Sequence, residues 1–139
     1  MSEESFEEQA SLRGVHVLLV GDDPESRELM KTVLEYAAAL VSTAASARGA
    51  LGALDAIRPD LLLCDLSTGG ENAENAVWLI EHMHALPWDA DIPAIVVTTR
   101  AARDERQRLL KAGFQEHFVK PIDPWELCRR VAALVTRDS

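Results

Sequence analysis

Cysteine, aromatic residues and long hydrophobic runs are all scarce in this chain. Its two cysteines, Cys64 and Cys128, lie in apolar surroundings without the spacing of metal ligands, which predicts reduced thiols in a hydrophobic core. No apolar run approaches the roughly 18 residues that a membrane span needs. The N-terminus reads Ser-Glu-Glu-Ser and does not resemble a signal peptide. We therefore expect a cytoplasmic protein with no membrane partner.

Positive charge is scarce as well. The chain has 14 Lys and Arg against 23 Asp and Glu, which gives a formal net charge of −9. Such an acidic surface repels nucleic acid, so we expect no nucleic-acid partner. Residues 1–13 are rich in Glu and are interpreted as a disordered acidic tail. With 47% apolar residues in a chain of 139, residues 14–139 are expected to form one domain with a hydrophobic core.

What the sequence does contain is a repeated order of short apolar runs and amphipathic segments. Apolar runs of this length are typical of strands buried on both faces, and they occupy 15–20, 40–44, 59–65, 93–98 and 114–119. Segments with apolar residues at helical spacing follow them, at 24–37, 46–57, 74–86, 102–112 and 123–135. Five strand–helix units predict an α/β fold with a parallel sheet and helices on both faces.

Local signals predict where helices begin and which sides they bury. Asp23 before a proline is expected to cap the first helix. Asp123 and Glu126 have the spacing of a capping box at the start of the last helix. Helical spacing also places Leu29 and Leu110 among the residues that face the core.

Polar residues stand where the predicted strands end. Asp22 and Asp23 follow the first strand, Asp65 ends the third, Thr98 ends the fourth and Lys120 follows the fifth. The carboxyl ends of parallel strands share one edge of the sheet, and ligands bind at that edge. Asp65 alone can also be interpreted as a helix cap or a solvated loop residue. The whole set, however, favours a common site.

These residue types suit phosphoryl transfer. Clustered carboxylates repel one another, and Mg²⁺ relieves that repulsion because it accepts one or two carboxylates together with phosphate oxygens. Once its charge is screened, the Asp65 carboxylate can attack a phosphoryl donor and form an aspartyl phosphate. The Lys120 ammonium and the Thr98 hydroxyl would then stabilise the phosphoryl oxygens. We predict Asp65 as the phosphoacceptor.

At this point the chain resembles the receiver domain of two-component response regulators over about residues 14–136. The resemblance rests on Val17–Val20 leading into Asp22-Asp23-Pro24 and Arg27, on Pro59-Asp60 through Asp65, on Pro93–Thr98, and on Lys120-Pro121 before a capped helix. It implies a flavodoxin-like, doubly wound, five-stranded sheet with strand order 2-1-3-4-5. It also implies a single-domain switch in a phosphorelay, and not an enzyme. The phosphoryl group would come from a sensor histidine kinase or a histidine phosphotransfer protein. The Lys120–Pro121 bond is usually cis in this family.

The chain departs from the family pattern at the implied metal site. The family's acidic pair falls on Gly21 and Asp22, so its first acid is missing. Asp22, Asp65 and the backbone carbonyl of Ser67 are the implied ligands of Mg²⁺. A shift of one residue, which makes Asp22 and Asp23 the working pair, is the alternative. The loop after the third strand is also longer than in the family.

The resemblance also implies that the protein signals through contacts with other proteins. His117 takes the family position of the switch aromatic, paired with Thr98, although a plain, partly buried strand residue is the alternative. Phosphorylation would change the face formed by the 102–112 helix, the 114–119 strand and the last helix. A downstream protein target or a second copy, in a homodimer, would bind this face.

Two other functions compete with the phosphoryl switch. Gly21, the altered loop and Thr99, where the family favours a smaller residue, motivate a degenerate receiver that acts as a phosphorylation-independent interaction module. A small phosphatase that turns over through an aspartyl phosphate is the third hypothesis. It is disfavoured because Ser67 stands where such enzymes usually carry a second aspartate.

Overall fold

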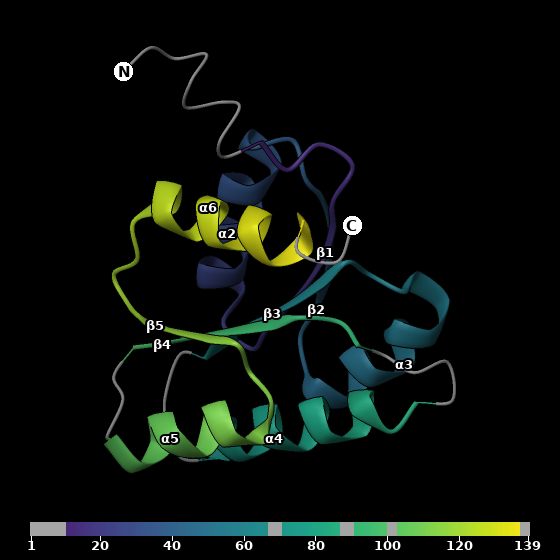
Figure 1. Ribbon diagram of the computed structural model, residues 1–139, viewed down its shortest axis with the longest axis vertical. Coiled ribbons are helices and arrows are strands. Elements are labelled where there is room, and N and C mark those ends of the chain that lie inside the picture. Colours follow the sequence, from purple (N-terminus) through teal and green to yellow (C-terminus); the bar gives the residue numbers. More distant parts are fainter. Residues whose placement is uncertain (1–10, 67–70, 87–90, 100–102, 137–139) are drawn as a thin grey trace.

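The structure is a computed structural model that describes residues 11–66, 71–86, 91–99 and 103–136. Strands and helices alternate in the predicted order (Figure 1). The elements are β1 (His16–Gly21), α2 (Pro24–Tyr36), β2 (Leu40–Ala44), α3 (Ala47–Ile57), β3 (Leu61–Leu66), α4 (Glu71–His84), β4 (Ala94–Thr98), α5 (Arg103–Ala112), β5 (Glu116–Val119) and α6 (Pro124–Thr136).

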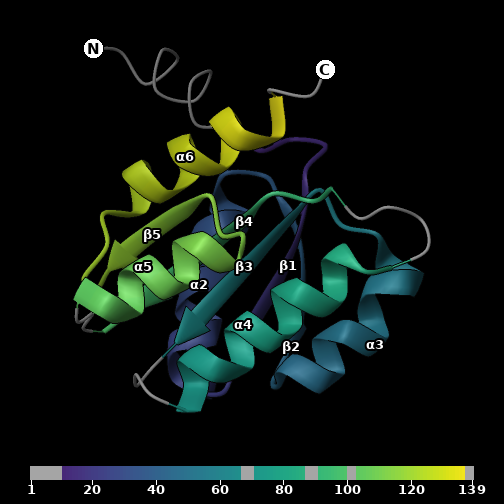
Figure 2. The ribbon, with the colours of Figure 1, turned by 60° about the horizontal axis from the view of Figure 1, so that its bottom comes forward.

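All strand pairs are parallel, and their order across the sheet is β2-β1-β3-β4-β5. This confirms the predicted flavodoxin-like topology. Helices α2 and α6 cover one face of the sheet, and α3, α4 and α5 cover the other (Figures 1 and 2). A helix connects each of the first four strands to the next, as parallel pairing requires.

The central strand β3 divides the core into two halves. Leu61 and Leu63 pack on the side of α2 and α6, whereas Leu62, Cys64 and Leu66 pack on the side of α3 and α4. All six residues of β3 are buried. Burying each leucine contributes roughly 1.5–3 kcal/mol. The strand that ends at the candidate site is therefore held rigidly from both faces.

Helix ends follow the predictions in part. The Asp123 carboxylate accepts the Trp125 N–H at 2.9 Å, so it caps α6, but the Glu126 carboxylate pairs with Arg129. Asp23 occupies the cap position of α2 without a side-chain bond to the backbone, so the predicted cap bond is wrong. Pro24 fits the first position of the helix, where a backbone N–H would have no partner within the helix.

Two predicted core residues are wrong. Leu29 is 67% exposed and Leu110 is 36% exposed. Their neighbours Met30 and Leu109 face the core instead. Adjacent helical positions point about 100° apart, and in α2 and α5 the core face takes in Met30 and Leu109 but not the leucine next to each.

Leu12 belongs to the core although it falls in the segment that we interpreted as a tail. Its side chain is fully buried, and its N–H donates to the Ala37 carbonyl at 2.7 Å, beyond the end of α2. Residues 1–10 lie outside the described residues. Cys64 and Cys128 are buried free thiols, as predicted. Among the described helices, none has the length and apolar composition to cross a membrane.

Candidate functional site

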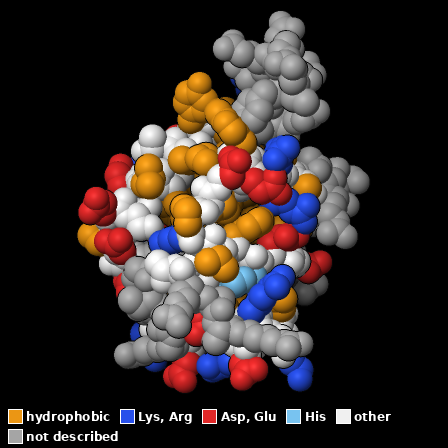
Figure 3. All heavy atoms as spheres, turned by 90° about the vertical axis from the view of Figure 1, so that its left-hand side faces the viewer, with side chains coloured by type: hydrophobic (Ala, Val, Ile, Leu, Met, Phe, Trp, Pro, Cys, Tyr) orange, Lys and Arg blue, Asp and Glu red, His pale blue; other side chains and the backbone are white. Residues whose placement is uncertain are grey.

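Strand register brings the predicted site residues to one edge of the sheet. Gly21 lies opposite Asp65 in the β1–β3 pair, and Thr98 lies opposite Leu66 and Val119 in its two pairs. The Lys120 N–H donates to the Thr98 carbonyl at 2.7 Å. Figure 3 faces this edge, where charged and hydrophobic side chains lie side by side.

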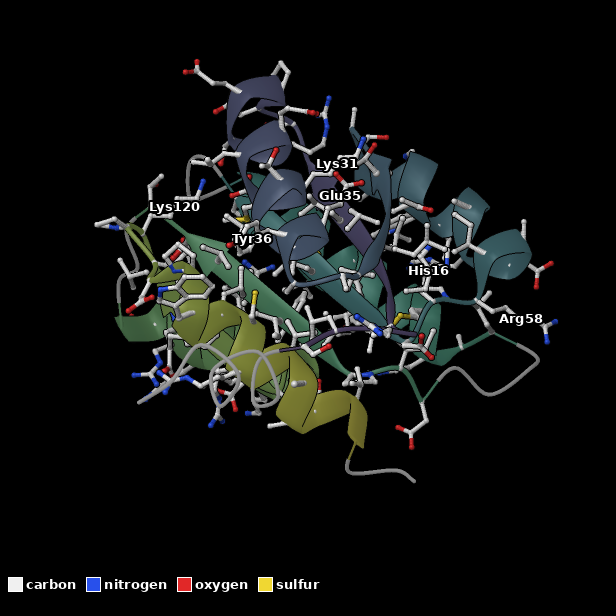
Figure 4. The ribbon with its side chains drawn as sticks, turned by 90° about the horizontal axis from the view of Figure 1, so that it is seen from above. His16, Lys31, Glu35, Tyr36, Arg58 and Lys120 are labelled. Atoms are coloured by element: carbon white, nitrogen blue, oxygen red, sulfur yellow. The ribbon has the colours of Figure 1, made fainter. Side chains whose placement is uncertain are left out.

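Asp65 and Lys120 form a buried ion pair. The Lys120 ammonium lies 2.5 Å from Oδ1 of Asp65, whose side chain is fully buried. Lys120 reaches inward from the end of β5 toward the start of α2 (Figure 4), and its side chain stays 19% exposed. A carboxylate in such a place needs a nearby positive charge, because burying it without one is costly. The Lys120–Pro121 peptide bond is cis.

The second carboxylate oxygen of Asp65 is the unusual atom of the site. Both carboxylate oxygens of Asp65 are buried and lack a partner with hydrogen-bond geometry among the described residues, and Oδ2 also lacks the ammonium contact that Oδ1 has. An unsatisfied buried oxygen at a sheet edge suits a cation or a water molecule as its partner. A side chain at position 21 would crowd it, because an added Cβ would lie 3.4 Å from Oδ2 and 3.1 Å from the Asp65 carbonyl. Gly21 therefore leaves open space beside the orphaned oxygen.

A cavity of about 140 Å³ adjoins this space. The ends of β1 and β3, the start of α3 and the first half of α4 line it, and its polar residues are Asp22, Ser46, Asp65 and Asn75. Since a water molecule takes about 30 Å³ in the liquid, the cavity admits several waters. The space suits a hydrated cation beside Oδ2.

The carboxylates present match a sparsely ligated, water-rich metal. Among the described residues, no three Asp, Glu, His or Cys side chains gather as a complete metal site. Mg²⁺ keeps several waters and needs only one or two carboxylates, which Asp65 and the exposed Asp22 can supply. Ser67, the third predicted ligand, lies outside the described residues. If the acidic pair is shifted by one residue, Asp22 and Asp23 form it, and Asp23 is then a further candidate ligand.

Thr98 and His117 contact each other directly. The Thr98 hydroxyl, in a residue that is 1% exposed, lies 3.1 Å from Nε2 of the half-buried His117. Burial lowers the pKa of His117, the nearby Arg106 lowers it further, and Glu105 opposes them. His117 is therefore mainly neutral at pH 7, with one ring nitrogen able to accept the hydroxyl proton.

Ser26 is a site residue that the sequence did not reveal. Its hydroxyl accepts a hydrogen bond from the Lys120 ammonium at 2.9 Å. A serine in the first turn of a helix is common and carries no signal of its own. Only the approach of β5 to α2 in three dimensions identifies it.

The remaining residues of interest lie away from this edge or at its rim. Trp78 is half-buried and stacks on His82, with ring centroids 4.2 Å apart, while Trp125 packs against Tyr36. Arg106, Arg108 and Thr99 are exposed.

Comparison with known proteins places this arrangement in a family. The family model described as "Response regulator receiver domain" matches residues 17–132. An "Uncharacterized 14.6 kDa protein in sodA1 3'region" of Leptolyngbya boryana is 36% identical over 121 residues, which cover 87% of this chain and 90% of that protein. The phosphate regulon transcriptional regulatory protein PhoB of Escherichia coli K12 is 30% identical over 123 residues, 88% of this chain. Those residues are 52% of PhoB, so this chain spans about half the length of that relative.

Solved structures share the fold. The CheY-like response regulator receiver domain protein of Methanospirillum hungatei has a TM-score of 0.74 at 25% identity, covering 88% of this chain and 94% of that one. The receiver domain of sensor histidine kinase PA1611 from Pseudomonas aeruginosa has a TM-score of 0.76 at 22% identity, covering 88% and 98%. In that structure a magnesium ion is coordinated in the active site cleft.

Proposed function

The chain belongs to the family of response regulator receiver domains, and from this premise we propose that it is a phosphorylation switch with Asp65 as the phosphoacceptor. The donor is a phosphohistidine on a sensor histidine kinase or a histidine phosphotransfer protein. One observation carries the proposal. A fully buried carboxylate at the end of β3 has an ammonium 2.5 Å from one oxygen, and its other oxygen has no partner among the described residues.

The chemistry is an in-line displacement at phosphorus. A carboxylate oxygen of Asp65 forms the new P–O bond, and the P–N bond to the donor histidine breaks. The electron pair of that bond leaves with the ring, which is released as neutral imidazole because its other nitrogen carries a proton. Asp65 thereby becomes a neutral acyl group, and the negative charge moves outward onto the phosphoryl oxygens. The Lys120 ammonium stays close enough to stabilise that charge.

The proposed cofactor is Mg²⁺. The carboxylates of Asp22 and Asp65 would hold it, together with the Ser67 carbonyl and waters in the adjoining cavity. When bound, it neutralises the carboxylates and polarises the phosphoryl oxygens. The orphaned Oδ2 of Asp65 supports this fit, while Gly21 contributes no acid.

Thr98 and His117 are the proposed switch. After transfer, the Thr98 hydroxyl turns from Nε2 of His117 to a phosphoryl oxygen, and the imidazole loses its partner. The change reaches the face formed by α5, β5 and α6, where Val119 is 49% exposed. A downstream protein, or a second copy in a homodimer, then binds this face with altered affinity.

Intact mass spectrometry tests the proposal. The protein is incubated with acetyl phosphate, a small phosphodonor, and millimolar Mg²⁺. A gain of about 80 Da, the mass of one phosphoryl unit, is expected in the wild type and not in Asp65→Asn. An adduct that persists in Asp65→Asn, or no adduct with any phosphodonor or histidine kinase, contradicts it.

One observation favours a second candidate function. Gly21 places no carboxylate beside the orphaned oxygen, where the family carries an acid, which weakens the case for a cation. A degenerate receiver would bind its partner without phosphorylation. Titration with Mg²⁺, followed by tryptophan fluorescence, separates the two, because a flat response at millimolar Mg²⁺ favours the degenerate receiver.

A further inference from the structure

Lys120 is held by two oxygen atoms from different elements. Its ammonium contacts Oδ1 of Asp65 at 2.5 Å and donates to Oγ of Ser26 at 2.9 Å. Asp65 ends β3, and Ser26 is the third residue of α2, 94 positions before Lys120 in the chain. Figure 4 shows Lys120 beside the start of α2. The hydroxyl therefore fixes the direction from which the ammonium approaches the carboxylate.

The charge distribution at the start of α2 makes the Ser26 hydroxyl important for holding Lys120. The amino end of a helix carries partial positive charge and repels a cation. The Lys120 ammonium lies at the first turn of α2 all the same, with its side chain 19% exposed. An oxygen acceptor on that turn offsets the repulsion and replaces part of the water that the ammonium loses. Without Ser26, the flexible lysine stem would gain freedom to move away from the helix.

We propose that Ser26 is a positioning residue for phosphoryl transfer to Asp65, acting through Lys120. This inference rests on the proposed function and adds a residue to it. In the resting state the ammonium neutralises the carboxylate. During transfer that charge disappears from Asp65 and appears on the phosphoryl oxygens, so the ammonium has to shift outward while staying in the site. Ser26 holds one of its three N–H groups during this shift.

The test compares variants at position 26 with a matched loss of a hydroxyl elsewhere on α2. Ser26→Ala removes the acceptor, and Ser26→Thr retains a hydroxyl. Thr32→Ala is the control, because the Thr32 hydroxyl is exposed and donates only to the Glu28 carbonyl of the same helix at 3.0 Å. Phosphorylation rates are measured by intact mass over a series of acetyl phosphate concentrations.

We expect Ser26→Ala to lower the maximal phosphorylation rate about threefold to tenfold, the net effect of one typical intramolecular hydrogen bond. The phosphodonor concentration at half-maximal rate should stay unchanged, because Ser26 acts on transfer and not on donor binding. Ser26→Thr should recover most of the rate, and Thr32→Ala should match the wild type.

Three results would overturn the inference: a wild-type rate in Ser26→Ala, an equal loss in Thr32→Ala, or a loss confined to the half-maximal concentration. Failure of the proposed function looks different, because then the wild type itself acquires no phosphoryl group. Urea denaturation of each variant checks that folding is intact, so that a slow variant is compared at the same folded concentration.

Discussion

Replacing Lys120 with Met should destabilise the fold through the carboxylate that remains behind. Methionine keeps much of the apolar stem and removes the ammonium. The Asp65 side chain is fully buried, so bulk water cannot take the place of Lys120. Removing one partner of a buried ion pair costs about 3–5 kcal/mol. Because Lys120 is itself 19% exposed and a cavity lies alongside, we expect the lower end, about 3 kcal/mol.

Urea denaturation in the presence of a chelator measures this loss without interference from a bound cation. The decisive comparison is the double variant Lys120→Met with Asp65→Asn. A neutral amide needs no counter-charge, so the double variant should recover most of the lost stability. The wild type, the two single variants and the double variant together give the coupling between the two side chains.

A free energy of unfolding of Lys120→Met within about 1 kcal/mol of the wild-type value would contradict this prediction, because an unpaired buried charge costs well above that. The prediction is also contradicted if adding Asp65→Asn to Lys120→Met restores none of the lost stability. In that case the loss would come from packing of the lysine stem and not from the charge of Asp65.

Three further predictions concern the surroundings of the site. Gly21→Ala should lower the free energy of unfolding in urea by about 1 kcal/mol or more, because the added Cβ would lie 3.1 Å from the Asp65 carbonyl. Gly52→Ala, on the open surface of α3, should raise it instead. Equal effects of the two substitutions would contradict this prediction. The pKa of His117 is lower in the folded protein than in the unfolded chain, where it is near 6.5. The fold is therefore more stable above pH 6.5, where His117 is neutral in both states, than at low pH. The wild type should therefore lose stability relative to His117→Phe as the pH falls from about 7 through the lower folded-state pKa, and parallel profiles would refute it. Burial raises the pKa of the Cys64 thiol to about 12 and that of the Cys128 thiol to about 11. A thiol reagent at pH 8 should therefore label neither cysteine until urea unfolds the chain.

The sequence predicted those features that depend on local pattern. Apolar runs and helical spacing identified all five strands and the helices between them, because burial on both faces leaves an uninterrupted apolar run in strands such as β3. The meeting of Asp65 and Lys120 was also predictable, since parallel strands share a carboxyl edge. The order of the strands needed the family resemblance.

Features that depend on packing between distant segments were not predictable. Ser26 contacts Lys120 only because β5 ends beside α2. Leu29 and Leu110 satisfied the apolar pattern, yet each lies one position from the residue that the helix buries. Leu12 is buried, and its N–H donates to the Ala37 carbonyl, a contact that no residue pattern in the acidic segment predicts.

The contacts of the site explain how a small chemical change can alter a distant surface. In the resting state a single buried charge on Asp65 holds Lys120, and Lys120 links β5 to the start of α2. Thr98 is meanwhile bonded to His117 on the edge strand. Phosphorylation of Asp65 would remove the negative charge that holds the Lys120 ammonium and place phosphoryl oxygens where the Thr98 hydroxyl can reach them. Both rearrangements involve β5, so under the proposed function the face formed by α5, β5 and α6 would respond to the state of Asp65 through two separate bonds. His117→Phe removes the Thr98–His117 bond and keeps the Thr98 hydroxyl, so it should weaken the response of that face and leave phosphorylation of Asp65 intact, whereas loss of Lys120 should impair both.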